Sequence, residues 1–123
     1  LRGRIERLAE RLEELVAEPA HPALLHGDIW SGNLRVGEGR IHGLIDPAIY
    51  AGHPEIELAF LTMFGTAGAP FFDAYAALRP EFDRRGFAER RPLYLIYPHL
   101  THVMIEGPGW ARPLAALLDR LGA

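Results

Sequence analysis

Apolar residues recur every three or four positions in several stretches of this chain, a spacing typical of helices. The first stretch covers residues 3–17, where glutamate and arginine occupy the opposite side, so we expect an amphipathic surface helix. The chain then enters a linker marked by Pro19 and Pro22. The same spacing predicts later helices that begin at Pro54 and that cover residues 70–78, 87–106 and 111–121.

The region 87–106 differs from the others because both of its sides are apolar after Pro92. A helix that is apolar nearly all round is usually buried, and Pro98 is expected to kink or end it. The expected core residues of the later helices are Ile56, Ala59, Phe60 and Met63; Phe71, Phe72, Tyr75 and Leu78; Leu93, Tyr94, Ile96, Tyr97, Leu100, Thr101, Val103 and Met104; and Leu114, Leu117, Leu118 and Leu121.

Two stretches show strand patterns instead. Leu24 and Leu25 are expected to form a short buried strand. Residues 34–45 read as a β-hairpin whose turn is Gly37-Glu38-Gly39. The predicted fold class is therefore mainly α with a small β-hairpin (α+β), in a single domain of residues 1–123.

Composition narrows the function classes. The net charge of −3 indicates neither a nucleic-acid-binding protein nor one that binds anionic lipid. The absence of cysteine excludes disulfides and zinc sites built on thiolates. The chain also has no lysine, since all 13 basic residues are arginine. A mechanism that requires a phosphate-anchoring lysine cannot be completed by these residues alone.

The candidate chemistry lies between the predicted strand and the hairpin. Asp28 follows His26 and Gly27, Asn33 comes five residues later, and Asp46 follows the hairpin. Such spacing allows all three side chains to face one cleft, and glycines beside them permit the tight turns. A carboxylate that accepts a proton and two oxygen ligands for Mg²⁺ are the groups that phosphoryl transfer to a hydroxyl requires.

These residues suggest separate roles. Asp28 is the natural general base, and Asn33 and Asp46 are candidate magnesium ligands. His26 is better explained as a structural donor that hydrogen-bonds the backbone near the metal-binding segment. Asp and Asn are also common in turns, so the argument depends on the combination and not on any one residue.

The segments 26–33, 43–48 and 52–59, which read HGDIWSGN, GLIDPA and GHPEIELA, resemble the fructosamine kinase (ketosamine 3-kinase) family. That family belongs to the aminoglycoside phosphotransferase-like branch of the protein-kinase fold. The resemblance extends over nearly the whole chain but matches the family's C-terminal lobe alone. It implies an ATP-dependent kinase that phosphorylates a sugar hydroxyl of ketoamines in deglycation repair, with Mg²⁺ as cofactor and ATP as co-substrate.

The resemblance also assigns residues. It implies that Asp28 is the catalytic base, that Asn33 and Asp46 bind magnesium, and that Trp30 either lines the sugar site or packs within the loop. Related sequences usually carry aspartate at the position of Glu57, which would support the catalytic loop from the next helix, and the longer glutamate is expected to alter this support. No residue of this chain is assigned to nucleotide binding.

The family's N-terminal lobe, with its lysine, has no counterpart in these residues. We therefore expect a lobe whose partners are the missing N-terminal lobe and a ketoamine small molecule or glycated protein. We expect no nucleic acid and no membrane partner, because the chain is acidic and has no apolar run long enough to span a bilayer. We also expect the lobe to expose apolar surface that the N-terminal lobe would otherwise cover, and such a surface favours self-association. A cytoplasmic location is the default, because no signal peptide is visible.

Three alternatives stay open from the sequence. The chain could be a kinase lobe for an aminoglycoside or another small hydroxyl compound. It could be a remnant that binds without catalysis. It could also be a metal-dependent hydrolase that uses His26 and Asp28 with other histidines, since His99 and His102 share a helix face.

Overall fold

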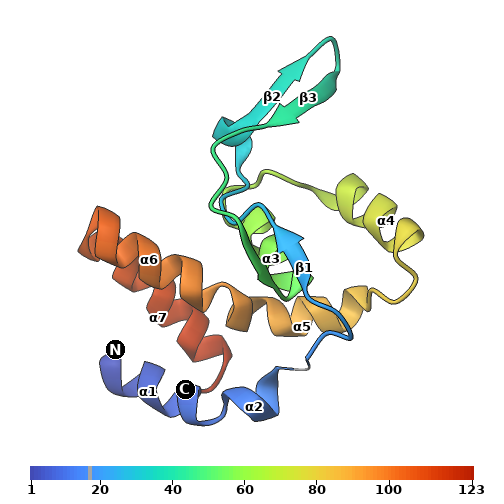
Figure 1. The fold of residues 1–123 in the computed structure, drawn as a ribbon. Coiled ribbons are helices and arrows are strands. Elements are labelled where there is room, and N and C mark those ends of the chain that lie inside the picture. The colour runs from blue at the N-terminus through green and yellow to red at the C-terminus, as the bar shows by residue number, and fades with distance from the viewer. Residues whose placement is uncertain (17) are drawn as a thin grey trace. The chain divides into compact units, whose positions relative to one another are not determined.

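The structure is a computed structural model that describes residues 1–16 and 18–123. It consists of short helices with two small antiparallel sheets, which confirms the predicted fold class (Figure 1). The chain divides into two compact units, one made of residues 1–18 and 85–123 and the other of residues 19–84. Each unit is described by itself.

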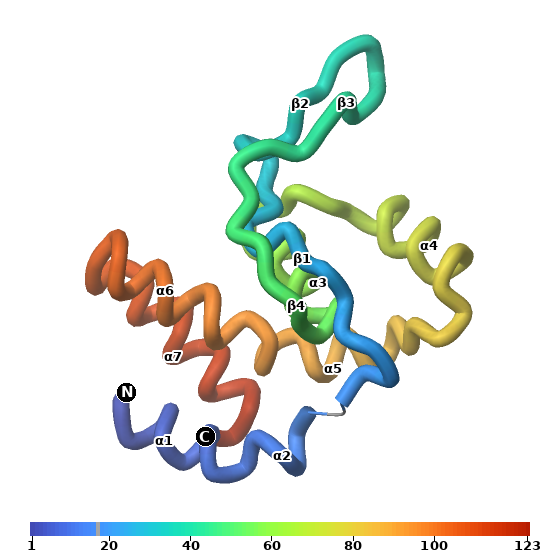
Figure 2. The backbone as a smooth tube through the Cα atoms, in the orientation of Figure 1, coloured from blue at the N-terminus to red at the C-terminus, as the bar shows by residue number. Residues whose placement is uncertain are grey.

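The unit of residues 19–84 contains both sheets. Strand β1 (Ala23–Leu25) pairs antiparallel with β4 (Tyr50–Gly52), and Figure 2 shows the two side by side. Strands β2 (Leu34–Gly37) and β3 (Arg40–Leu44) form the predicted hairpin. The sequence did not predict β4, because a three-residue strand that pairs with a distant segment leaves no alternating pattern. Leu25 is buried as expected, whereas Leu24 is exposed.

The conformation of the turn between β2 and β3 explains why the local sequence was sufficient to predict this hairpin. Glu38 and Gly39 both have positive φ angles, 51° and 76°. Two-residue turns with two positive φ angles match the right-handed twist of the flanking strands. Glycine adopts this conformation without strain, so the sequence specified the position of the turn.

Helix α3 (Pro54–Met63) begins where the sequence predicted. The His53 ring accepts a hydrogen bond from the backbone N–H of Glu55 at 3.1 Å, and Pro54 occupies the first turn, where it costs no hydrogen bond. The predicted buried face is partly wrong, since Ile56 and Met63 are half-buried. The residues of α3 that are buried are Glu55, Leu58, Ala59, Phe60 and Leu61.

Helix α4 (Ala69–Leu78) occupies the predicted range after a loop. Phe72 is buried, but Phe71 and Leu78 are exposed, so the prediction of a four-residue core is wrong for these two. An aromatic cluster accounts for the exposed ring, because Phe71 contacts both Phe72 and Tyr75. Aromatic contacts of this kind stabilise a helix surface without burying every ring.

In the other unit the first predicted helix is interrupted. Helix α1 (Arg2–Glu10) ends at Arg11, and α2 (Leu12–Leu15) follows as a separate turn. Position 17, the end of the predicted helix, lies outside the described residues. The N-terminal helix is joined to the C-terminus, because the Arg4 guanidinium donates to the Ala123 carbonyl at 2.6 Å and pairs with Asp119 at 2.7 Å.

The long helical region is divided into α5 (Arg84–Tyr94) and α6 (Ile96–Glu106). The division falls at Leu95, so the region is interrupted near Pro98 as predicted. Proline has no N–H to donate to the carbonyl four residues earlier, which is that of Tyr94, the last residue of α5. Pro98 itself lies in the first turn of α6, where the missing N–H costs no hydrogen bond of that helix. Leu93, Tyr94 and Ile96 are buried as predicted, whereas Tyr97 and Met104 are exposed. Leu95, which was not among the expected core residues, is buried as well.

The final part of this unit consists of a 3₁₀ turn η2 (Pro108–Trp110) and helix α7 (Ala111–Arg120), both of which contact α6. Leu114, Leu117 and Leu118 of α7 are buried, as predicted, and Leu121 is half-buried. None of the helices described in residues 1–16 and 18–123 has the length and apolar character that crossing a bilayer requires.

Candidate functional site

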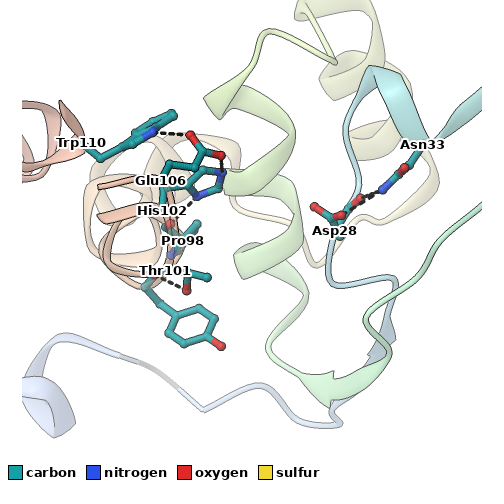
Figure 3. Close-up of polar contacts among 8 residues, drawn as sticks. Asp28, Asn33, Pro98, Thr101, His102, Glu106 and Trp110 are labelled. Carbon is teal, nitrogen blue, oxygen red and sulfur yellow. Dashed lines mark hydrogen bonds and ion pairs between the residues drawn. The ribbon is translucent and has the colours of Figure 1, made fainter. Parts of the chain in front are cut away.

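The loop between β1 and β2 brings Asp28 and Asn33 into direct contact. A 3₁₀ turn η1 (Ser31–Asn33) ends this loop, and the Asn33 side chain is buried. Its Nδ2 group donates to the Asp28 backbone carbonyl at 2.8 Å and to the Asp28 carboxylate at 3.0 Å (Figure 3). A backbone carbonyl only accepts, so these bonds set the amide orientation and leave Oδ1, the atom that binds metals, for another partner.

His26 connects this loop to the segment that carries Asp46. Its Nε2–H donates to the Ile45 carbonyl at 3.0 Å, and its Nδ1 accepts a hydrogen bond from the Asp28 N–H at 3.3 Å. A carbonyl cannot donate and a backbone N–H cannot accept, so the ring is neutral with its proton on Nε2. One imidazole thus links the backbone of Asp28 to the residue that precedes Asp46.

Backbone bonds also hold residues 45–48 to the loop. The Ile45 N–H donates to the Asn33 carbonyl at 3.0 Å, and the Ala48 N–H donates to the His26 carbonyl at 2.8 Å. Asp46 lies between these two bonds and has a φ angle of 52°, in the left-handed region that non-glycine residues rarely adopt. Such strain is found most often at functional sites and persists where surrounding contacts stabilise it.

Glu57 of α3 holds the loop between β1 and β2 through hydrogen bonds to its backbone. Its carboxylate accepts hydrogen bonds from the backbone N–H groups of His26 at 3.0 Å and Gly27 at 2.8 Å. Both distances are normal for N–H···O hydrogen bonds, so the longer side chain of glutamate makes both bonds to the loop backbone.

Gly27 allows the loop to approach the Asp46 segment closely. It has a φ angle of 81°, and a Cβ at this position would lie 2.1 Å from the Ala48 carbonyl oxygen. The spacing of glycines predicted a tight turn here. The close contact with Ala48 was not evident from the sequence, because it joins segments about twenty residues apart.

Trp30 packs within its own loop and remains partly accessible. A Cβ at Gly32 would lie 2.3 Å from the indole ring, so the ring lies across this glycine. The indole also contacts Phe64, with ring centroids 6.2 Å apart. Nothing in the sequence pattern identified Phe64, which follows the last residue of α3.

The donor set at this site fits magnesium. Asn33 Oδ1 and the Asp46 carboxylate offer hard oxygen atoms, and Mg²⁺ is commonly bound by one or two protein oxygens together with phosphate and water oxygens. The residues that the structure describes contain no group of three or more His, Asp or Glu side chains able to hold a metal ion. A magnesium ion here would therefore depend on phosphate oxygens for much of its coordination.

His99 and His102 do not form the metal site that the hydrolase alternative requires. Their Nδ1–H groups donate to the backbone carbonyls of Leu95 at 2.8 Å and Pro98 at 2.7 Å. The His102 ring stacks at a tilt on Trp110, whose indole N–H donates to Glu106 at 2.6 Å (Figure 3).

Burial lowers the pKa of the His99 imidazole, the hydrogen bond to the Leu95 carbonyl partly opposes this, and the nearby His102 lowers it further. A buried imidazole with a lowered pKa is neutral near pH 7. The His99 ring packs edge-on against Trp110 of η2, with ring centroids 5.6 Å apart. The described residues include no group of three or more metal-binding side chains of the kind that the hydrolase alternative requires.

Comparison with known proteins identifies the family of this sequence. The sequence model of the fructosamine kinase family matches residues 2–122. This chain belongs to the fructosamine kinase family. The matched range includes the whole of the loop between β1 and β2 and the segment that carries Asp46.

Relatives of this fructosamine kinase family member are longer than the chain. It is 35% identical over 115 residues to the chloroplastic protein-ribulosamine 3-kinase of Arabidopsis thaliana, covering 94% of the chain and 33% of the plant protein. It is 41% identical over 90 residues to the ketosamine-3-kinase of Mus musculus, covering 72% of the chain and 28% of the mouse protein. The chain thus spans about a third of the curated relatives it matches.

A solved structure shares the fold. A candidate fructosamine-3-kinase from Thermobifida fusca YX-ER1 superposes with a TM-score of 0.81 at 33% identity, covering 98% of this chain and 41% of the other. Nearly all of the chain thus corresponds to one part of a larger kinase-family structure.

Proposed function

We propose that this chain is the C-terminal, catalytic lobe of an ATP-dependent kinase that phosphorylates a sugar hydroxyl of ketoamines. The observation that carries the proposal is the hydrogen-bonded arrangement of Asp28, Asn33 and the segment of Asp46. The names of the relatives support the ketoamine class, since one is a ribulosamine kinase and another a ketosamine kinase.

The chemistry follows from the residues present. Asp28 orients the acceptor hydroxyl and takes its proton as the hydroxyl oxygen bonds to the γ-phosphorus of ATP and the bond to the β,γ-bridging oxygen breaks. Asn33 and Asp46 would hold Mg²⁺, which supplies charge neutralisation at the phosphates. Glu57 holds the loop in place through its hydrogen bonds to the backbone of His26 and Gly27. The His26 ring holds the segment of Asp46 beside this loop through its hydrogen bond to the Ile45 carbonyl.

The rest of the nucleotide site belongs to other residues. The chain contains no lysine to anchor the triphosphate, and its relatives are about three times as long. We propose that an N-terminal lobe supplies these contacts, and that the physiological acceptor is a small ketoamine or a glycated protein. A cytoplasmic location stays a prediction. The Arabidopsis relative is named as chloroplastic.

The test is a chimera in which residues 1–123 replace the matching part of the Thermobifida protein. We expect the chimera to phosphorylate fructosyl-lysine with ATP and Mg²⁺, and the 123-residue chain alone to show little or no turnover. Transfer of ³³P from labelled ATP to the acceptor measures both. The unaltered Thermobifida protein is the control for the assay.

Two results would contradict the proposal. Rapid phosphorylation by the chain alone would overturn the requirement for a second lobe. An inactive chimera beside an active control would favour a remnant that has lost catalysis, and a chimera that phosphorylates an aminoglycoside but not fructosyl-lysine would favour the other kinase class.

Replacing Asp46 with asparagine in the chimera should raise the Mg²⁺ concentration needed for half-maximal activity. We expect an increase of at least about tenfold, since even groups that merely orient a metal ligand are typically worth 10–100-fold. A magnesium titration at saturating ATP measures this. Glu38→Gln, which removes an exposed carboxylate from the hairpin turn, should leave the titration unchanged; equal curves for both variants would argue against Asp46 as a ligand.

A further inference from the structure

The outer face of helix α6 is apolar and exposed. Tyr97, Met104 and Ile105 keep 69%, 85% and 78% of their surface accessible. Residues seven and eight positions apart lie on one side of a helix, so these three side chains form a single group. Thr101, one turn after Tyr97, lies among them, and its hydroxyl donates to the Tyr97 carbonyl at 3.1 Å. We call Tyr97, Thr101, Met104 and Ile105 the α6 stripe.

The rest of α6 accounts for its packing and its charge. The helix contacts η2 and α7, and the residues that it buries include His99. Its one acidic or arginine residue is Glu106, at the last position. The Glu106 carboxylate accepts a hydrogen bond from the Trp110 indole at 2.6 Å and lies 3.8 Å from His102 Nε2. The α6 stripe therefore carries no charged side chain.

Other helices of the same unit show what an exposed helix side usually carries. The exposed residues of α1 include Arg2, Glu6 and Arg7, and those of α7 include Arg112 and Asp119. Exposed apolar residues that occur singly need no explanation. A contiguous group of them on one helix without charges is typical of a surface that another segment covers.

The size of the α6 stripe argues against a second copy of the chain as its occupant. Nine helical residues form a strip about 12 Å long and about 10 Å wide. A stable interface between two separate proteins buries about 800 Å² on each partner, several times the area of such a strip. Separate chains also lose translational and rotational freedom when they associate, whereas segments of one folded polypeptide do not incur this cost.

Most of the polypeptide in relatives of this chain lies outside the matched residues. The chain covers 33% of the Arabidopsis relative and 41% of the Thermobifida structure. We propose that the α6 stripe is the docking surface for the part of the kinase outside residues 1–123, which packs an uncharged apolar segment against it. This inference rests on the proposed function, in which these residues are one lobe of a longer kinase.

Met104 allows the stripe to be probed directly. Hydrogen peroxide converts an accessible methionine to its sulfoxide, and peptide mass spectrometry follows each methionine separately. We expect rapid oxidation of Met104 in the 123-residue chain, where the side chain is exposed. In the chimera we expect oxidation at least about tenfold slower, a factor that corresponds to about 1.4 kcal/mol of docking free energy.

A substitution tests the same contact through stability. Met104→Gln keeps a residue of similar helix propensity, so it should leave the urea unfolding of the 123-residue chain unchanged. In the chimera it should raise the equilibrium constant of unfolding roughly 10–100-fold, the contribution of burying one apolar side chain. The matched control is Leu78→Gln. Leu78 is 80% exposed at the end of α4, and its substitution should change neither protein.

The outcomes separate this inference from the proposed function. An inactive chimera that protects Met104 would contradict the function and support the docking, and an active chimera that leaves Met104 unprotected would do the reverse. If the chimera does not fold, the rest of the Thermobifida protein is added to the chain as a separate polypeptide, and oxidation at an undiminished rate would overturn the inference.

Two further results would also overturn it. The first is slow oxidation of Met104 in the chain alone; acceleration on dilution would then identify a second copy as the occupant. The second is an equal effect of Met104→Gln and Leu78→Gln on the unfolding of the chimera.

Discussion

Asparagine in place of Asp28 should reduce the turnover of the chimera by about 10²–10⁴-fold, the usual contribution of general-base catalysis. The substitution keeps the shape of the side chain. Asn33 donates one hydrogen bond to the Asp28 backbone carbonyl, which is unaffected. It donates another to the carboxylate, and the oxygen of the new amide is able to accept this bond, which becomes weaker because the acceptor is neutral. The loop should therefore persist, and the loss is that of a group able to take the acceptor's proton.

The measurement is kcat for fructosyl-lysine together with the affinity for Mg²⁺-ATP. We expect kcat to fall while the nucleotide affinity stays within about twofold, because Asp28 is not assigned to the phosphates. Asp119→Asn, which alters an exposed aspartate of α7, is the control and should leave kcat unchanged. A rate equal to that of the unsubstituted chimera would refute the assignment of Asp28.

Alanine in place of Gly27 should destabilise the chain by roughly 2–5 kcal/mol, since a positive φ angle costs about 1–2 kcal/mol in any L-residue and overpacking costs about 1–3 kcal/mol more. The overpacking term arises because the added Cβ would meet the Ala48 carbonyl oxygen at 2.1 Å. The Ala48 backbone is itself held by its bond to His26, so relief of the contact would break the connection between the loop and the Asp46 segment.

Gly39→Ala is the matched control for this effect. Gly39 also has a positive φ angle, 76°, but nothing lies within 4 Å of its added Cβ. It should lose only the conformational term, about 1–2 kcal/mol. Urea unfolding of the 123-residue chain measures both variants. Equal losses would show that the close approach to Ala48 contributes nothing to stability.

Short-range rules were sufficient for part of this protein. The hairpin turn and the start of α3 were predictable because both depend on neighbouring residues. Glu38 and Gly39 adopt the turn conformation, Pro54 suits the first turn of a helix, and the His53 side chain caps that helix two residues away. The proximity of Asp28 and Asn33 was foreseeable as well, since the two residues are only five positions apart and the glycines beside them permit tight turns.

Helix faces were less predictable where the pattern was ambiguous. Helix α3 is apolar on most sides, so periodicity did not distinguish the face of Ile56 from that of Leu58. In α6 the same ambiguity concealed the fact that Tyr97 and Met104 are exposed. Apolar character specifies that a residue is able to be buried, and its neighbours in space decide whether it is.

By itself the sequence determined the mainly helical fold, the hairpin, and the three polar residues of the candidate site. Tertiary structure alone decided the pairing of β1 with β4, the approach of Gly27 to Ala48 and the placement of Phe64 against Trp30. The physical reason is separation along the chain. Local conformation is encoded in neighbouring residues, whereas contacts between distant segments depend on how all the intervening elements pack.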